Sequence, residues 1–186
     1  MTLQEIREEI DAIDLALRDL LLRRLDCSAA VAQSKMESGD TQVLRTDREA
    51  EVLGKLGEGV PEEKRLEYLA IVRKILETSR MYQYGLMYRQ NPQSFEALVE
   101  DMGPRNESAR VTIEVTRPDR PGSMAQILSM IGDHGYSMEK MVPVEGAGKR
   151  GEVTFELTIW GNLRERGMER LLCQLAGECI RLKIKE

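Results

Sequence analysis

The first half of the chain is almost free of residues that break helices. Its first glycine is Gly39 and its first proline is Pro61. Between residues 3 and 38 the apolar residues recur in steps of three and four, which places them along one face of a helix. They are Leu3, Ile6, Ile10, Ile13, Leu17 and Leu20. Such a helix would be roughly 50 Å long, longer than a compact domain of this size. We therefore expect it to pair along its length, and a second copy of the chain is the simplest partner.

Two further helices are expected before residue 90. The second spans about residues 47–56, and Thr46 and Glu49 have the spacing of a capping box at its start. The third spans about residues 62–89. Its expected inner face carries Leu66, Leu69, Val72 and Leu76.

The pattern changes after residue 90. Asn91-Pro92 and Gly103-Pro104 indicate a linker over residues 91–109, with a short helix possible near 95–101. From Val111 apolar and polar residues alternate, which is typical of a strand. Further strands are expected at 138–144, 153–159 and 180–184, and helices at 122–131 and 164–176. The order βαββαβ predicts an α+β, ferredoxin-like unit over residues 110–186.

Polar residues interrupt the apolar faces of the first-half helices. In the first helix, the same steps of three and four continued past Leu20 lead to Arg24 and Lys35. In the third helix, the steps continued past Leu76 lead to Ser79 and Gln83. Arg7 borders the first row, and on the second helix Glu49 shares a face with Leu53 and Leu56, beside Arg48.

Such inward polar groups have two explanations. A buried cation needs a partner, and a single arginine on a helix usually extends its head to water. Glu49 could serve only the capping box, and Ser79 could bond to its own helix. Because several groups break their rows together, we favour a polar pocket for a doubly charged anion.

These positions, in this order and at this spacing, resemble the all-helical chorismate mutase family across residues 3–89. The resemblance implies a three-helix domain over residues 1–90 that forms an intertwined homodimer with two active sites. It implies that Arg24, with Arg7 from the partner chain, binds the substrate carboxylates, and that Lys35 and Gln83 contact the ether oxygen. It further implies that Glu49 holds the ring hydroxyl, while Arg48 and Ser79 line the pocket.

This sequence departs from the family at the start of the second helix. Arg45 stands where an aspartate is common, and one extra residue lies between Lys35 and Arg48. The implied reaction is the rearrangement of chorismate to prephenate in aromatic amino-acid biosynthesis. It is pericyclic and intramolecular, so it requires no metal, cofactor or nucleophile.

The second half resembles an ACT domain through the run Asp119-Arg120-Pro121-Gly122-Ser123-Met124. The resemblance implies allosteric control by an aromatic amino acid (Phe, Tyr or Trp) that contacts Asp119, Gly122, Ser123 and Met124. A plain turn before a helix is the alternative interpretation of this run. Pairing of two such domains could raise the assembly above a dimer.

Composition limits the remaining functions. The net charge of -5 disfavours binding to nucleic acid or to an anionic membrane. Three cysteines without a CxxC pair, and no apolar run of membrane length, favour a cytoplasmic protein.

Three alternatives to a regulated chorismate mutase stay open. Isochorismate-pyruvate lyases use a similar helical site. A non-catalytic amino-acid sensor or helical interaction module would keep the fold without the reaction. A subunit could also be active only together with another enzyme of the shikimate pathway.

Overall fold

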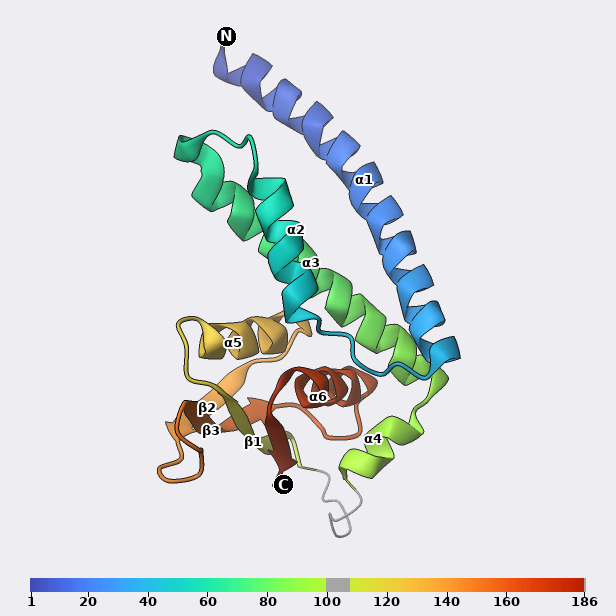
Figure 1. Cartoon of the computed structure of the whole chain (residues 1–186), viewed down its shortest axis with the longest axis vertical. Coiled ribbons are helices and arrows are strands. Elements are labelled where there is room, and N and C mark those ends of the chain that lie inside the picture. The colour runs from blue at the N-terminus through green and yellow to red at the C-terminus, as the bar shows by residue number, and fades with distance from the viewer. Residues whose placement is uncertain (100–107, 186) are drawn as a thin grey trace. The chain divides into compact units, whose positions relative to one another are not determined.

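The computed structural model describes residues 1–99 and 108–185. The chain forms two compact units, Met1–Leu86 and Met87–Glu186 (Figure 1). The expected linker, residues 91–109, is described only in part, because residues 100–107 lie outside the described residues. Within the described residues, no helix is both long and apolar enough to cross a membrane.

The first unit is helical, as the sequence predicts. It contains α1 (Leu3–Ser38), α2 (Thr46–Gly57) and most of α3 (Glu62–Gln90). A capping box fixes the start of α1: the Thr2 Oγ1 accepts from the Glu5 backbone N–H at 3.2 Å, and the Thr2 N–H donates to Glu5 Oε2 at 2.6 Å. Gly39 ends α1 in the left-handed conformation, with φ of 73°.

The capping box predicted for the second helix is wrong. The N-cap residue of α2 is Arg45, Thr46 already lies inside the helix, and no side chain caps this end. Because the helix begins one residue earlier than the box requires, the Glu49 side chain is not engaged in capping and reaches another partner.

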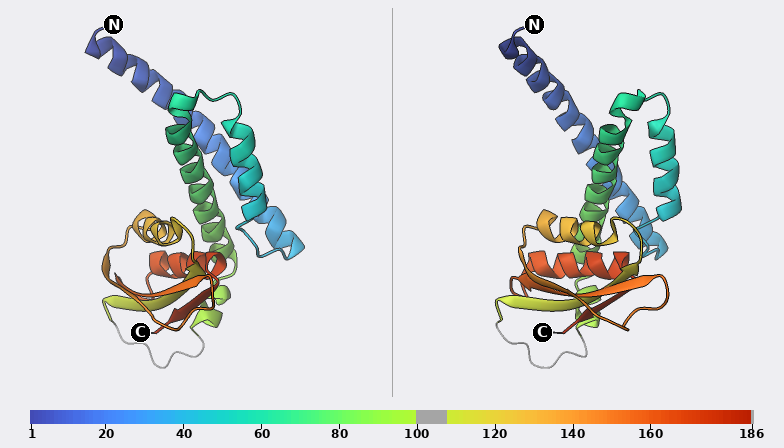
Figure 2. Two further views of the ribbon diagram at one scale, coloured as in Figure 1. Left: turned by 60° about the vertical axis from the view of Figure 1, so that its left-hand side comes forward. Right: turned by 90° about the vertical axis from the view of Figure 1, so that its left-hand side faces the viewer.

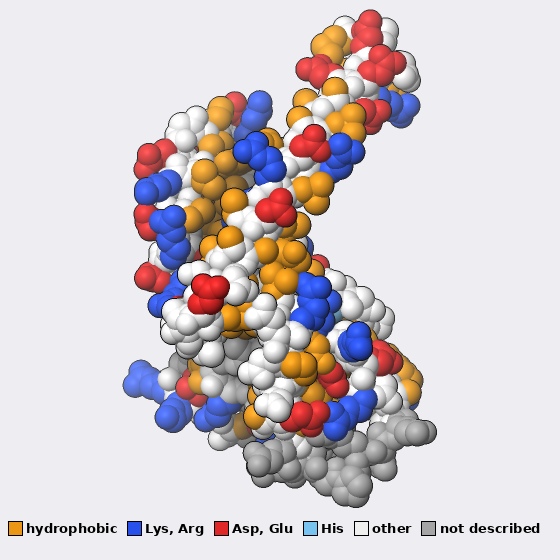
Figure 3. All heavy atoms as spheres, turned by 90° about the vertical axis from the view of Figure 1, so that its right-hand side faces the viewer, with side chains coloured by type: hydrophobic (Ala, Val, Ile, Leu, Met, Phe, Trp, Pro, Cys, Tyr) orange, Lys and Arg blue, Asp and Glu red, His pale blue; other side chains and the backbone are white. Residues whose placement is uncertain are grey.

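The apolar row of α1 is largely exposed in the single chain. The exposed fractions of its six residues lie between 40% and 63%. The N-terminal part of α1 projects away from α2 and α3 (Figure 2), and orange apolar side chains are visible along it in Figure 3. On α3, Val72 is buried, whereas Leu66 is 74% exposed and does not lie on an inner face as predicted.

The second unit has the predicted ferredoxin-like fold. Its elements are β1 (Arg110–Pro118), α5 (Ser123–Asp133), β2 (Met138–Pro143), β3 (Glu152–Trp160), α6 (Arg166–Glu178) and β4 (Arg181–Ile184), preceded by the short α4 (Gln93–Leu98). The strands form one antiparallel sheet in the order β2-β3-β1-β4. Helices α5 and α6 lie on the same face of this sheet (Figure 2).

One hydrophobic core fills the space between that sheet face and the helices. Alternate residues of β1 point into it, because side chains of a strand alternate between faces; Ile113 pairs with Leu157 of β3, and both are fully buried. Helix α6 contributes Leu171, and Phe95 of α4 is also buried in the cluster. The second unit therefore has a complete core of its own.

Candidate active site

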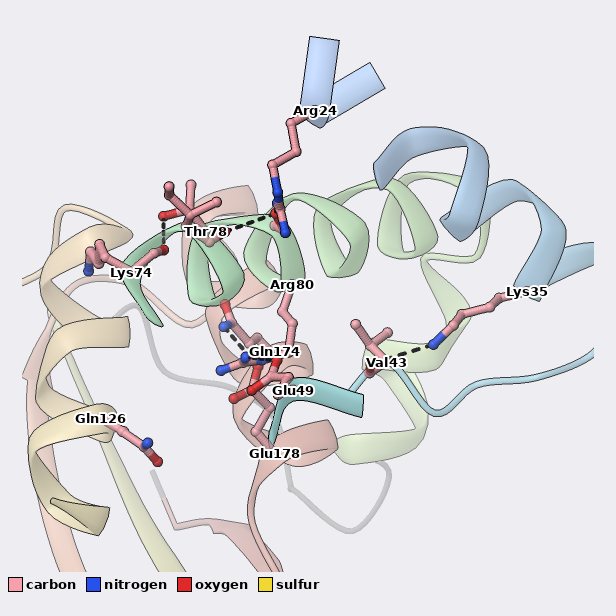
Figure 4. A network of polar contacts seen from close by, with 12 residues as sticks. Arg24, Lys35, Val43, Glu49, Lys74, Thr78, Arg80, Gln126, Gln174 and Glu178 are labelled. Atoms are coloured by element: carbon pink, nitrogen blue, oxygen red, sulfur yellow. Dashed lines mark hydrogen bonds and ion pairs between the residues drawn. The ribbon is translucent and has the colours of Figure 1, made fainter. Parts of the chain in front are cut away.

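The first inward polar group is Arg24, near the middle of α1. Its Nη1 donates a hydrogen bond to the Ser79 hydroxyl of α3, and the side chain is partly buried (Figure 4). The Ser79 Oγ in turn donates to the Ile75 carbonyl at 2.9 Å. Ser79 therefore bonds to its own helix, as one interpretation of the sequence allowed, and also accepts from Arg24. This contact joins α1 to α3 through a cation.

Lys35 lies eleven residues further along α1 and is partly buried. Its Nζ donates to the backbone carbonyl of Gln42 and, at 3.5 Å, to that of Val43 (Figure 4). Burial lowers the pKa of Lys35; Asp40 acts in the opposite direction, and Arg45 lowers it further. Both acceptors lie in the segment that enters α2, so Lys35 holds that segment while its ammonium is partly desolvated.

Gln83 lies one turn after Ser79 on α3 and is only 9% exposed. Its Oε1 is buried and has no hydrogen-bond partner among the described residues. Leaving such an acceptor unsatisfied costs about 1–3 kcal/mol. A buried polar group in this state requires an explanation, and a ligand bound beside α3 is one that fits.

The two α2 residues of the predicted site have different surroundings. Arg48 pairs with Glu51 at 2.6 Å, and its side chain is 62% exposed. Glu49 instead forms an ion pair with Arg80 of α3, whose side chain is only 7% exposed. The two neighbours therefore point in different directions, Arg48 to the surface and Glu49 toward α3.

Arg80 is a further polar residue of the site, and the spacing of α3 already places it on the inner face. A step of three from Leu76 leads to Ser79, but a step of four leads to Arg80, which is equally compatible with the inner face of a helix. Arg80 is therefore a buried cation on the inner face of α3, and it was not among the predicted site residues.

Arg7 lies apart from the other predicted residues. It is exposed on the projecting part of α1, and its separation of 17 positions from Arg24 corresponds to about 26 Å along the helix. The chain by itself does not bring these two arginines into one site.

The predicted effector residues lie at the turn between β1 and α5. Gly122 is the N-cap residue of α5 with φ of 83°, a conformation that favours glycine. Asp119 and Gly122 are exposed, and Met124 packs against the core. Ser123 is buried, and its hydroxyl donates to the Pro118 carbonyl at 2.7 Å. The turn is thus a well-defined structure in which the Ser123 hydroxyl already has a partner.

Comparison with known proteins shows which proteins parts of this chain are similar to. Residues 6–84 match the family model described as chorismate mutase type II. Among solved structures, the chain is similar to the prephenate dehydratase from Arthrobacter aurescens, which was solved in complex with L-Phe, with 18% sequence identity and a TM-score of 0.40. That match covers 44% of this chain and 27% of the dehydratase chain. No curated protein matches the chain. The helical segment is thus similar to chorismate mutase type II, and this similarity supports chorismate mutase activity, an isomerisation.

Proposed function

Starting from a chorismate mutase type II domain over residues 6–84, we propose that this chain converts chorismate to prephenate under the control of an aromatic amino acid. The observation that carries the proposal is the bond between Arg24 and Ser79. It places a guanidinium between helices where the apolar pattern calls for a hydrocarbon side chain. Gln83, with its unsatisfied carbonyl, lies one turn away on the same helix.

Each polar group has a task in this reaction. Arg24 binds a substrate carboxylate, and Ser79 fixes the direction of its guanidinium. Lys35, through its ammonium, and Gln83, through its side-chain amide N–H, stabilise the negative charge that grows on the ether oxygen as its bond to carbon stretches. Glu49 accepts the hydrogen bond of the ring hydroxyl, and Arg48 lines the entrance. Groups that bind the transition state better than the ground state accelerate the step. Holding the flexible dianion in its compact, reactive conformer supplies the remainder of the rate enhancement.

The bonds of Lys35 are compatible with this task. An ammonium has three N–H donors, and the carbonyls of Gln42 and Val43 accept two of them. The third N–H remains for the ether oxygen of the substrate. The segment before α2 therefore orients the ammonium before substrate arrives, which is the preorganisation that electrostatic catalysis requires.

A second copy of the chain completes the site in this proposal. Ile10, Ile13 and the other apolar residues of α1 remain substantially exposed in one chain, and burying the exposed part of each would contribute on the order of 1 kcal/mol. Pairing along this row brings Arg7 of one chain to the Arg24 site of the other. We therefore infer a homodimer in which each site uses both chains.

The ferredoxin-like unit acts as an ACT domain that senses phenylalanine, tyrosine or tryptophan. The effector lies at the turn formed by Asp119, Gly122, Ser123 and Met124, where the backbone N–H groups of the first turn of α5 that follow Ser123 can receive its carboxylate; the Ser123 N–H already donates to the Arg120 carbonyl at 3.2 Å. The protein works in the cytoplasm, without a metal or cofactor.

The test follows the loss of chorismate by purified full-length protein, with and without each aromatic amino acid. We expect turnover in the absence of effector and a change in rate with one of the three. A parallel assay with isochorismate distinguishes a lyase, which would release pyruvate. Protein that leaves chorismate unchanged at every effector concentration would be a sensor or an interaction module and would overturn the proposal.

A further inference from the structure

We propose that Arg80 of α3, and not Arg48 of α2, is the cation that positions Glu49 for the substrate; this inference rests on the proposed function. The resemblance to the family gives Arg48 a place in the pocket and gives Arg80 none. In the structure it is Arg80 that contacts Glu49, whereas Arg48 pairs with Glu51 at the surface.

The contrast between the two arginines begins with their surroundings. Arg48 and its partner Glu51 have side chains 62% and 46% exposed, as in an ordinary i,i+3 pair on a helix surface, and such pairs contribute little. Arg80 and Glu49 have side chains 7% and 26% exposed. A desolvated guanidinium next to a carboxylate forms a strong and directional interaction.

The place of Arg80 along α3 connects it to the rest of the site. It follows Ser79, which accepts from Arg24 of α1, and it precedes Gln83 by less than one turn. One turn of α3 therefore contacts α1 through Ser79 and α2 through Arg80 (Figure 4). A shift of Arg80 would move Glu49 relative to both Arg24 and Gln83.

The charge balance explains why Glu49 needs such a partner. A bare carboxylate would repel a substrate that carries two negative charges. Arg80 offsets this charge and binds Oε1 of Glu49, and the second carboxylate oxygen can accept the substrate hydroxyl. Arg80 is thus a positioning residue that acts through Glu49.

The departures in the loop before α2 agree with this assignment. Arg45 occupies a position that is commonly acidic, and its Nη2 pairs with Asp40 at 2.7 Å. Together with the extra residue before Arg48, this arrangement belongs to a segment that enters α2 differently from the family pattern. The cation that the family takes from α2 then comes from α3.

The test uses the whole chain and five variants: Arg80→Gln, Arg48→Gln for comparison, Arg73→Gln as the control at an exposed position of α3, Glu49→Gln, and the double variant Arg80→Gln/Glu49→Gln. We expect Arg80→Gln to lower kcat/KM by about ten- to a hundredfold, as for loss of a hydrogen bond to a charged group. We expect Arg48→Gln to lower kcat/KM clearly less than Arg80→Gln, because the Arg48 side chain is 62% exposed, and we expect the control Arg73→Gln to stay within about threefold of the parent. In the Glu49→Gln background, replacing Arg80 should cause little additional loss, because the carboxylate that it positions is already absent.

Several outcomes would overturn the inference. One is a loss at Arg48→Gln as large as that at Arg80→Gln, and another is a double variant whose losses multiply, which means that the two residues act independently. If Arg80→Gln does not fold, as judged by circular dichroism, the same cycle is run with Arg80→Lys, which keeps the charge; additive losses there overturn the inference as well. Parent protein that does not convert chorismate overturns the proposed function, and the inference falls with it. Active parent protein with an unaffected Arg80→Gln variant overturns the inference alone.

Discussion

The two units of this chain use their hydrophobic residues in opposite ways. In the ferredoxin-like unit, Ile113, Leu157 and Leu171 are fully buried between the sheet and its helices. In the helical unit, the apolar row of α1 is exposed, and the groups between the helices include Arg24 and Gln83. The first arrangement is typical of a domain that is stable by itself. The second leaves apolar surface exposed in the single chain, and in the proposed dimer a second copy covers it.

The largest expected effect concerns the polar interior of the helical unit. Lys35→Ala should lower kcat by about 10²- to 10³-fold, because it removes a preorganised donor to the charge that grows in the transition state. Substrate binding should weaken far less. Steady-state kinetics with chorismate measure both constants, and Lys64→Ala, at an exposed position of α3, serves as the control. Equal turnover in Lys35→Ala and the parent would remove Lys35 from the mechanism.

The next effect tests the need of the helical unit for a partner. Ile13 is 51% exposed in the single chain, so Ile13→Asp should cost a lone chain little. If α1 pairs with a second copy, the carboxylate enters an apolar interface, and dimers should dissociate with a loss of activity of more than about tenfold at low protein concentration. Analytical ultracentrifugation measures the assembly. Asp11→Asn, on the same helix but outside the apolar row, is the control, and an unchanged Ile13→Asp dimer would exclude pairing through this row.

A smaller effect probes the self-sufficient unit. Leu171→Ala should lower the free energy of unfolding of the ferredoxin-like unit by about 2–5 kcal/mol, because it leaves a cavity in a dense core. Chemical denaturation of the full chain should then show an earlier transition for this unit and an unchanged transition for the helices. A single transition that shifts as a whole would show instead that the two units unfold together.

The smallest effect is a shift along the pH axis. Only the protonated Lys35 can stabilise the ether oxygen, and burial lowers the pKa of Lys35 from the ordinary value of 10.5. Turnover should therefore decline on the alkaline side at a pH below 10.5. Across that window the unfolded chain binds more protons at Lys35 than the folded chain, so the contribution of this group to stability rises with pH. A decline that coincides with unfolding, or one that persists in Lys35→Arg, would contradict this explanation.

The elements of the fold could be predicted from the sequence because their signals are local. Steps of three and four located α1, and the alternation of Val111, Ile113 and Val115 located β1. The cap of α2 was not predictable in this way, because Thr46 and Glu49 keep the right spacing although the helix begins at Thr46 itself.

The candidate site was harder to predict because the spacing of residues in the sequence does not determine where each side chain points. Arg48 and Glu49 are neighbours in sequence, yet only Glu49 turns toward α3. Arg80 belongs to the inner face by a step of four from Leu76. The inner face of a helix can hold two residues in one turn, and following one row of positions finds only one of them. Contacts between elements, such as those from Arg24 to Ser79 and from Arg80 to Glu49, appear only when the helices are placed in space.

The separation of Arg7 and Arg24 along α1 has a genetic consequence. In the proposed dimer, one helix serves two sites, so a chain that lacks Arg7 and a chain that lacks Arg24 each remove a different component of a site. When the two defective chains associate, both defects fall in one site and the other site is whole. Two inactive alleles would then complement each other, with mixed dimers recovering up to half of the parental rate.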